Sequence, residues 1–320
     1  EQVTVKNSII KFISSQLSSD LKIEQAKISK VSSWMPARKA RLEFEGQLNE
    51  GNLQIQMDLS PFGNDVMAAG RIKLKGLSLG PFAQLWKPHL KSLEGRLDAD
   101  LDIDTKQTAD AGFSHTQKGR LNLHQVRTQI EDTDFSNKRL AWDGTVRLEI
   151  PKSAETLKIA ANGRLNGSQF AMASQNENPQ IQQEDLTWEG KVNFEQTAGA
   201  ANLKVDSVLT LQNTRVSAPD VKLAEEKLTW NGTFQFSSTA ETDGQRIVAD
   251  GTLDGGHLLM HLLDGKLSFE HSGMAWKGRL DSGATNDFDS LSAEGDLRLK
   301  EVQIHYPQTK LNLLNSGGVA

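Results

Sequence analysis

The sequence predicts a mainly β protein: an elongated, repeating antiparallel sheet that is curled into an open groove, an arrangement like a folded taco. Three observations predict it. A tryptophan-containing phrase recurs along the chain, apolar and polar residues alternate with a period of two around each copy, and turn-forming residues separate the alternating runs. Helices are expected only near residues 7–19 and 81–91.

The composition excludes several classes of protein. The 320 residues include 36 Lys+Arg and 41 Asp+Glu, so the net charge of −5 argues against a nucleic-acid-binding protein. The absence of cysteine excludes disulfides, thiolate metal sites and cysteine nucleophiles. No apolar run approaches the roughly 20 residues that a membrane-spanning helix needs.

The repeat is carried by a phrase of the form Leu-x-Trp-x-Gly, with Met for Leu in one copy. Phe44 replaces tryptophan in an earlier copy, and the copy around Gly95 keeps only the second half of the phrase. The glycines fall at positions 46, 95, 144, 190, 232 and 278, with steps of 49, 49, 46, 42 and 46. The sequence therefore predicts one continuous array over residues 1–320, with about six modules of 42–49 residues. The tryptophans of the four complete copies are Trp142, Trp188, Trp230 and Trp276.

Each phrase is predicted to form a strand with one apolar face. Trp142, Gly144 and Val146 share one face, whereas Asp143 and Thr145 share the other. Alternation is clearest over residues 95–105, where aliphatic side chains alternate with four aspartates. A glycine two residues after a tryptophan leaves a hollow, which we expect the indole of a neighbouring strand to cover.

Two segments favour a helix instead. Residues 7–19 place Ile9, Ile10, Ile13 and Leu17 on one stripe, which predicts a helical N-terminal element over residues 1–20. Residues 81–91 begin with a proline suited to a first helical turn, and they contain Pro88, which should end or kink the helix.

A sheet with one apolar face must cover it by closing into a barrel, by packing on a second sheet, or by curling around it. A phased repeat that does not alternate with helices favours the curled, open sheet. The residues then predicted to line the groove are Phe44, Leu48, Leu97, Leu101, Ile103, Trp142, Val146, Leu148, Trp188, Val192, Phe194, Trp230, Phe234, Phe236, Trp276 and Leu280. A dry core formed by the same residues remains an alternative.

Three motifs could indicate chemistry, and each has a simpler interpretation. Ser78 lies in a Gly-x-Ser-x-Gly motif, but the repeated βαβ units of a hydrolase are missing from the pattern. The aspartates at 98, 100, 102 and 104 lack the glycine and glutamate of an EF-hand loop. His257, His261 and His271 lie in an apolar run without a closed ligand pattern. We therefore expect no enzyme activity, no metal and no cofactor.

One stretch of the chain resembles a known family. It reads Ala-Gly-Arg-Ile-Lys-Leu over residues 69–74, Leu-Ser-Leu-Gly-Pro-Phe over 77–82 and Leu-Glu-Gly-Arg-Leu-Asp-Ala-Asp-Leu over 93–101. This resembles the AsmA-like superfamily, which includes the TamB and YhdP proteins. The similarity is most specific over about residues 65–105. The segment from residue 21 to residue 28 also resembles parts of that superfamily.

The resemblance implies a function. Such proteins are anchored in the inner membrane of Gram-negative bacteria, extend through the periplasm and maintain outer-membrane lipid homeostasis. Their apolar β-groove conducts phospholipids between membranes and has no catalytic residues. For this chain the resemblance implies a periplasmic, monomeric fragment of a longer protein. Its partner would be a phospholipid or another acyl-chain lipid, and missing parts of the protein would contact the membrane.

Two other functions remain open from the residues alone. A closed β-solenoid or tandem sandwiches could serve as a structural or scaffolding element of the cell envelope, without transferring lipid. An adhesin-like or carbohydrate-binding repeat would place aromatic side chains outward, which the inward parity of the tryptophans disfavours.

Overall fold

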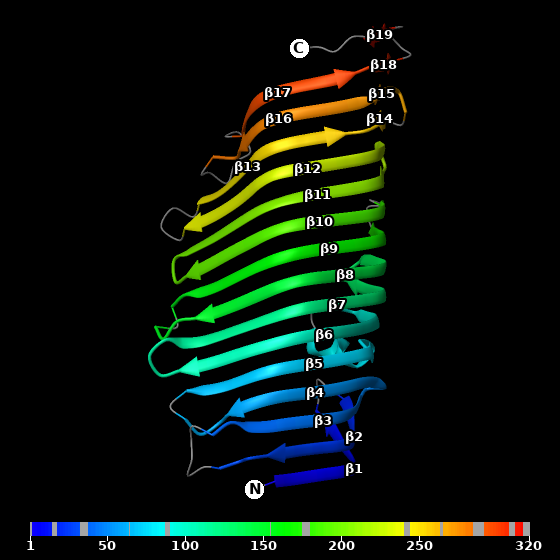
Figure 1. Cartoon of the computed structure of the whole chain (residues 1–320). Helices are drawn as coiled ribbons and strands as arrows, with labels where there is room; N and C mark the ends of the chain where they lie inside the picture. Colours follow the sequence, from blue (N-terminus) through cyan, green and yellow to red (C-terminus); the bar gives the residue numbers. More distant parts are fainter. Residues whose placement is uncertain are drawn as a thin grey trace. The chain divides into compact units, whose positions relative to one another are not determined.

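The protein is mainly β in a computed structural model, which describes residues 2–14, 18–32, 38–63, 65–86, 90–153, 155–174, 180–239, 244–262, 265–283, 291–306 and 311–315. Within these residues, nineteen strands belong to one antiparallel sheet that does not close into a barrel (Figure 1). This confirms the predicted mainly β, open antiparallel sheet, whereas the two predicted helices are wrong.

The strands become longer in the middle of the chain. The bounds of the first ten are β1 Gln2–Ile13, β2 Ser18–Ser29, β3 Ala40–Leu48, β4 Gly51–Ser60, β5 Val66–Ser78, β6 Ser92–Thr108, β7 Gly112–Ile130, β8 Thr133–Ile150, β9 Leu157–Ser174 and β10 Gln180–Thr197. The remaining nine are β11 Ala200–Ala218, β12 Val221–Thr239, β13 Gly244–Gly255, β14 Leu258–Leu262, β15 Leu267–His271, β16 Gly273–Asp281, β17 Ser292–Lys300, β18 Val302–Tyr306 and β19 Leu311–Asn315.

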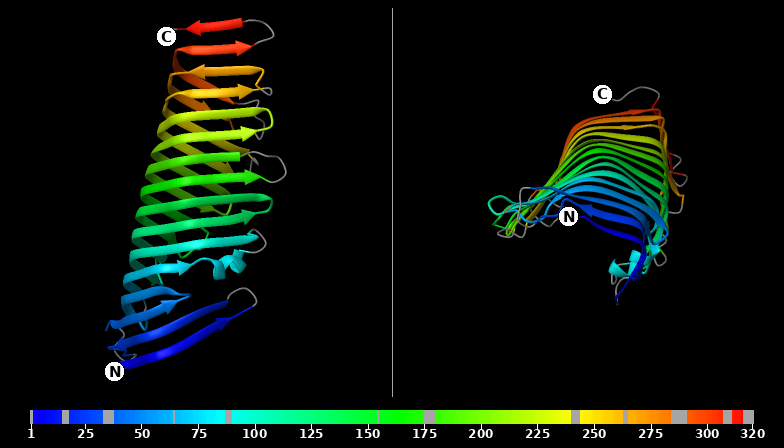
Figure 2. Two further views of the ribbon diagram at one scale, coloured as in Figure 1. Left: turned by 90° about the vertical axis from the view of Figure 1, so that its right-hand side faces the viewer. Right: turned by 60° about the horizontal axis from the view of Figure 1, so that its bottom comes forward.

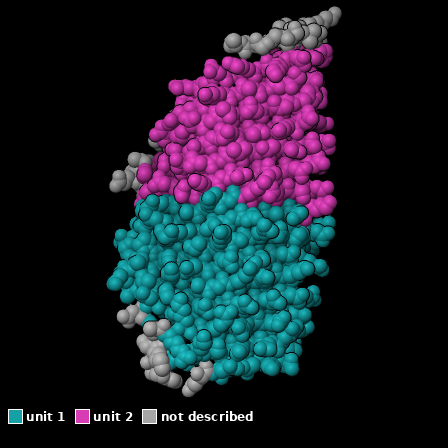
Figure 3. All heavy atoms as spheres, viewed as in Figure 1, with its two compact units in different colours: residues 1–131, 139–163, 194–198 teal, residues 132–138, 164–193, 199–320 magenta. Residues whose placement is uncertain are grey.

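The chain divides into two compact units, although the sequence repeat runs through both. Unit 1 comprises residues 1–131, 139–163 and 194–198, and unit 2 comprises residues 132–138, 164–193 and 199–320 (Figure 3). In unit 1, each strand from β1 to β7 pairs antiparallel with the next. In unit 2, the β14–β15 hairpin interrupts this series, so that β13 pairs with β16 and β12 pairs with both β13 and β14.

The long strands bend along their length (Figure 2), and several strands contain a left-handed residue. Gly76 has φ +75°, Gln125 and Gln169 have φ +51°, and Asn213 has φ +53°. At Gly76 the register between β5 and β6 shifts, as expected of a β-bulge. Such bulges let one strand keep an apolar face on both sides of a bend.

The predicted N-terminal helix is wrong. Residues 2–13 form β1, which pairs with β2, and residues 15–17 of the predicted helix lie outside the described residues. Asn7 has φ +48° and lies at a gap in the register, so Val5 and Ile10 share a face although they are five residues apart. This break in the period of two imitates helical spacing. Pairing with β2 gives the backbone N–H and C=O groups of β1 their hydrogen-bond partners, whereas a short isolated helix is only marginally stable in water.

The second predicted helix, over residues 81–91, is a 3₁₀ segment spanning Gly80–Trp86 and not an α-helix. Its start is fixed to the sheet by the hydrogen bond from Leu79 N to Gly95 O (3.0 Å). On its far side, Lys91 N donates to Gln129 O (2.8 Å), and β6 begins at Ser92. The short segment between these two hydrogen bonds has room for about two tight turns, and a 3₁₀ helix provides such turns.

Few apolar side chains are buried. Among the described residues they are Ile23, Ala40, Leu77, Ala99 and Val248. The chain exposes 20418 Å² of solvent-accessible surface, whereas a compact monomer of 35.2 kDa exposes about 13,000 Å². The excess is what a single-layer sheet exposes, because one layer leaves both of its faces in contact with solvent.

Candidate functional site: the apolar face of the sheet

In unit 2, one face of the sheet is built from apolar rows that cross successive strands. One row runs Leu209–Trp230–Leu253–Trp276–Leu297 over β11, β12, β13, β16 and β17. The row on one side of it includes Leu211, Leu228, Gly255, Met274 and Leu299. We call this surface the apolar face of unit 2. It arises because the registers keep the period of two in phase from strand to strand.

The next row of this face contains almost no side chains. Gly232, Gly251, Gly278 and Gly295 lie opposite one another on β12, β13, β16 and β17, and Ser207 continues the row on β11. Beyond it lies another apolar row, with Val205, Phe234, Ala249, Leu280 and Ala293. The glycine row is therefore a strip with apolar side chains on both sides.

Tryptophan rings lie over these glycines. A Cβ built on Gly232 would be 2.8 Å from Trp230 Cζ2, and one on Gly278 would be 2.9 Å from Trp276 Cζ2. The two rings are stacked, with centroids 6.3 Å apart and an interplanar angle of 22°. Each indole thus covers the glycine of its own strand, whereas we expected the indole of a neighbouring strand. In unit 1, Trp142 does both, because it covers Gly144 and also Gly163 on β9.

Unit 1 has an apolar face of its own between β2 and β7. One row runs Ala26–Phe44–Ile55–Ile72–Leu101–Gly119, and a second runs Ile28–Leu42–Met57–Gly70–Ile103. The opposite face is polar and carries ion pairs, including Arg71 Nε to Asp100 Oδ1 at 2.6 Å. The predicted separation of apolar and polar residues is therefore present in both units.

All sixteen residues predicted to line a groove are described, and none of them is buried. Fifteen are half-buried, and Leu280 is 38% exposed. Those whose register is known lie on the apolar face of their own unit: Phe44, Leu48, Leu97, Leu101, Ile103, Trp230, Phe234, Phe236, Trp276 and Leu280. A dry core between two opposed sheets would bury such side chains.

A set of polar residues at the bends was not recognised from the sequence. Each complete tryptophan phrase is preceded, five residues before its tryptophan, by a polar residue: Asn137, Gln183, Glu225 and His271. Gln183 and Glu225 are each 6% exposed, and His271 is 1% exposed. The constant spacing of these residues was the available signal, and the variety of residue types concealed it.

These polar residues bind the backbone at the bends. Glu225 Oε1 accepts a hydrogen bond from Gly256 N at 2.8 Å, where β13 ends and β14 is about to begin. Gln183 donates to Gln212 O and accepts from Thr214 Oγ1, on either side of the left-handed Asn213. In unit 1, Asp98 Oδ1 accepts from the bulge residue Gly76 at 2.6 Å. These side chains bind backbone N–H and C=O groups that the bulges leave without a hydrogen-bond partner in the neighbouring strand.

Burial shifts the pKa of two of these groups. It raises the pKa of Glu225, with hydrogen bonds from the backbone opposing the shift. Burial also lowers the pKa of His271, whose ring meets Phe269 edge-on at 5.7 Å between centroids. His271 Nδ1 and Asn137 Oδ1 are buried and make no hydrogen bond with the described residues.

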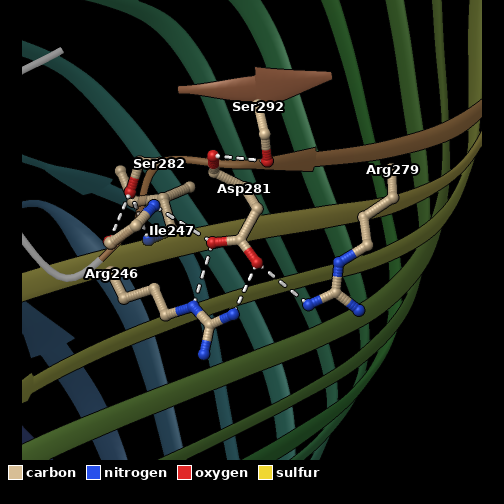
Figure 4. A network of polar contacts seen from close by, with 7 residues as sticks. Arg246, Ile247, Arg279, Asp281, Ser282 and Ser292 are labelled. Atoms are coloured by element: carbon tan, nitrogen blue, oxygen red, sulfur yellow. Dashed lines mark hydrogen bonds and ion pairs between the residues drawn. The ribbon is translucent and has the colours of Figure 1, made fainter. Parts of the chain in front are cut away.

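A separate polar cluster joins the ends of β13, β16 and β17 (Figure 4). Asp281 lies between two guanidinium groups, with Arg246 Nε at 2.9 Å and Arg279 Nη2 at 3.0 Å. These contacts hold the pKa of its carboxyl group well below the usual range. Ile247 N donates to Ser282 Oγ at 2.9 Å. The cluster fixes strand ends, and each of its charges has a partner within it.

The other motifs take structural positions. Two of the four aspartates of β6 lie between basic residues of β5 and β7: Lys73 and Arg120 are the register partners of Asp100, and Arg71 and Lys118 are those of Asp102. His257 Nε2 lies 2.8 Å from Glu270 Oε1, so it does not join His271 in a ligand set. Ser78 is the last residue of β5, opposite Arg96. Within the described ranges, no group of three or more His, Asp or Glu residues could hold a metal ion.

The described residues contain one helical segment, Gly80–Trp86. No described helix is long and apolar enough to cross a membrane. Comparison with protein-family models, with curated protein sequences and with solved structures found no match to this chain.

Proposed function

We propose that the apolar face of each unit binds the acyl chains of phospholipids, and that the sheet curls around them as an open groove. The observation that carries the proposal is the open apolar face itself. In unit 2 it extends unbroken over five paired strands, and no second layer of the described residues buries it. Monomers seldom expose more than a few hundred Å² of contiguous apolar surface unless it binds something.

The energetics favour a hydrocarbon ligand. Exposing a methylene group to water costs about 0.8 kcal/mol, so a two-chain lipid with roughly 30 methylenes faces a barrier of up to about 24 kcal/mol between bilayers. A continuous apolar surface removes much of this cost without binding the lipid at one fixed site. Such a surface suits the conduction of lipid better than its storage.

The tryptophan–glycine pairs support the same function. An aliphatic side chain at Gly232 would stand between Trp230 and Phe234 of the same strand, whereas the glycine leaves room for the indole of Trp230 to lie over the backbone. The result is a wide apolar surface of low relief. A surface of low relief accepts flexible acyl chains of different lengths, because it contains no pocket of fixed shape.

The cellular role proposed here rests on the resemblance of residues 65–105. We propose a periplasmic, monomeric module of a longer protein that is anchored in the inner membrane of a Gram-negative bacterium. It would move phospholipid between the membranes and maintain the lipid content of the outer membrane. This role is a binding and transfer function that requires no catalytic residue, metal or cofactor.

Site-specific photo-cross-linking in bacteria tests the lipid site. A benzophenone amino acid replaces Phe234 on the apolar face of β12, and a matched control replaces its neighbour Gln235 on the other face. Leu101 and Asp102 form the corresponding pair on β6 in unit 1. We expect phospholipid adducts, detected by mass spectrometry, at positions 234 and 101 and not at 235 and 102.

The alternatives give different results in the same experiment. A scaffolding protein would give adducts with other envelope proteins at position 234 and no co-purifying lipid. Equal lipid labelling at 234 and 235 would indicate non-specific contact with membranes. Either result would contradict the proposed function.

A further inference from the structure

The β1–β2 hairpin extends beyond the strand that follows it. The pairing of β2 with β3 ends at Leu21 and Leu48, but β1 and β2 remain paired as far as Ile13 and Ser18. We call residues 9–13 and 18–20 the hairpin tip; Figure 2 shows the hairpin in dark blue. Its base is held in place, because Asn49 N donates to Asp20 O at 3.0 Å and Asn49 Oδ1 accepts from Asp20 N at 2.8 Å.

The hairpin tip exposes large apolar side chains on both faces, although Lys11 and its register partner Asp20 lie between the isoleucines of the second face. Ile10 and Phe12 share one face and are 53% and 56% exposed, whereas Ile9 and Ile13 share the other and are 62% and 77% exposed. Elsewhere in unit 1 the face opposite the apolar rows carries ion pairs such as Arg71–Asp100. A single apolar face would match the lipid site proposed above, but exposed isoleucines on the second face need their own explanation.

The hairpin also differs from the rest of the chain in charge. Between residues 2 and 30 there are five lysines, at 6, 11, 22, 27 and 30, and two acidic residues, Asp20 and Glu24. The whole chain has a net charge of −5, so the remainder is acidic. Asp20 lies opposite Lys11 in the register, which leaves Lys6 and Lys22 as exposed cations near the tip.

We propose that the hairpin tip inserts into the surface of an anionic lipid bilayer. A projecting tip enters the boundary between headgroups and acyl chains with both of its faces, so Ile9, Phe12 and Ile13 would all leave water. The neighbouring lysines would meet the negative charge of the headgroups. A partner strand would instead pair with the backbone edge of β1 and leave the side chains on both faces exposed. The two exposed isoleucines of the second face, Ile9 and Ile13, therefore favour the bilayer.

Vesicle flotation of the full chain tests this proposal. The probes are phosphatidylcholine vesicles with and without phosphatidylglycerol, and we expect binding only to the vesicles that contain phosphatidylglycerol. The double variant Ile9→Ser/Ile13→Ser should weaken this binding at least about tenfold, because it removes two apolar side chains from the boundary. Lys6→Gln/Lys22→Gln should weaken it and reduce its dependence on salt.

Matched controls come from unit 2. Val208, which is 43% exposed and lies opposite Asn231, is changed to Ser, and the exposed Lys222 is changed to Gln. Both controls should bind vesicles within about twofold of the unchanged chain. Ile13→Ser alone, at the most exposed of the four positions, keeps the test valid if the double variant fails to fold.

Three results would overturn the proposal: absence of binding to phosphatidylglycerol vesicles, unchanged binding by Ile13→Ser and the double variant, or a dimer in solution that these substitutions abolish. The last result would assign the tip to contact with a second copy. The proposal is independent of the lipid site, because cross-linking at position 234 reports on the apolar face whether or not the tip binds membranes.

Discussion

Two regions of the sheet build the same kind of apolar face in different ways. In the aliphatic region, β2–β7, glycines lie in different rows: Gly46 is opposite Ile23 and Leu53, and Gly70 is opposite Met57 and Ile103. In the tryptophan region, which comprises β12, β13, β16 and β17, four glycines lie in one row. Tryptophans are found beside the aligned glycines, whereas Phe44 precedes the isolated Gly46.

The difference shows what the tryptophans contribute. A single glycine in the aliphatic region is surrounded by branched side chains from both neighbouring strands, which fill the gap. A row of four glycines has no such neighbours, and only a large flat ring can cover it from the adjacent row. We infer that the indoles stabilise this strip of the sheet in addition to forming its surface. Four experiments test or refine this comparison, in order of decreasing effect, and a fifth concerns the polar cluster around Asp281.

The largest effect is expected from Gly251→Leu. A Cβ at this position would lie 2.4 Å from Asn231 O and 2.7 Å from the Cα of Gly232, so the backbones of β12 and β13 must shift apart. We expect a loss of about 3 kcal/mol in the free energy of unfolding, measured by urea denaturation. Gly199→Ala is the control, because a Cβ there meets no atom within 4 Å. Equal stabilities of the two variants would contradict the proposed role of the glycine row.

Trp230→Leu should destabilise the protein more than Phe44→Leu. The first change uncovers one glycine of an aligned row and removes the stacking on Trp276, whereas the second uncovers an isolated glycine. We expect losses of about 2 and about 1 kcal/mol, below the values for fully buried rings because both side chains are half-buried. Chemical denaturation followed by circular dichroism measures both. Equal losses would mean that a ring beside an aligned row of glycines stabilises the protein no more than a ring beside a single glycine.

A double-mutant cycle measures the contact between the two stacked rings. Trp230→Leu and Trp276→Leu should show a coupling energy of about 1 kcal/mol, as aromatic pairs do. The cross-strand pair Ile55 and Ile72 of the aliphatic region is the reference, with an expected coupling of about 0.3 kcal/mol. A coupling between the tryptophans as small as that of the isoleucines would show that the rings cover their glycines independently.

The smallest effect concerns the bend of the tryptophan region. Because burial raises the pKa of Glu225, the folded state holds its proton more tightly than the unfolded state, so stability falls as pH rises from the unfolded pKa to the folded one. Glu225→Gln should remove this fall, because glutamine can still accept from Gly256 and does not ionise. Denaturation midpoints between pH 4 and pH 7 measure it. The control is Asp254→Asn at an exposed position on β13, which should keep the fall.

The cluster around Asp281 responds in the opposite direction. Its pKa is lowered by Arg246 and Arg279, so its stabilising effect is complete above the usual aspartate pKa of 3.8 and is lost as pH falls below it. Asp281→Asn should therefore be destabilised relative to the unchanged chain at neutral pH, with the difference shrinking in acid. Wild-type and variant midpoints measured from neutral pH down into acid check this sign.

Much of the fold could be predicted because the signals are local. The period of two placed Leu101 and Asp102 on opposite faces, and the phase of the glycines gave the alignment of Gly232 with Gly278 through β13. The bulges could not be predicted, because Gln125, Gln169 and Asn213 adopt left-handed conformations that glycine adopts more readily. The strand β1 was missed for the same reason, since Asn7 shifts the period within it.

The burial of the polar residues that precede the tryptophan phrases could also be learned only from the structure. Glu225 and His271 differ in size and charge, so their shared spacing was concealed, and only the structure shows that both side chains are buried. The sixteen lining residues were predicted from parity alone. Their incomplete burial could not be, because parity states which side chains share a face but not whether anything covers that face.

The sequence by itself determined which residues share a face of each strand, because alternation is a property of neighbouring residues. Only the tertiary structure decided that this face stays open in each unit, since covering it depends on contacts between distant segments that no local pattern encodes. It also decided that the first dozen residues form a strand, because the backbone of β1 finds its hydrogen-bond partners in β2.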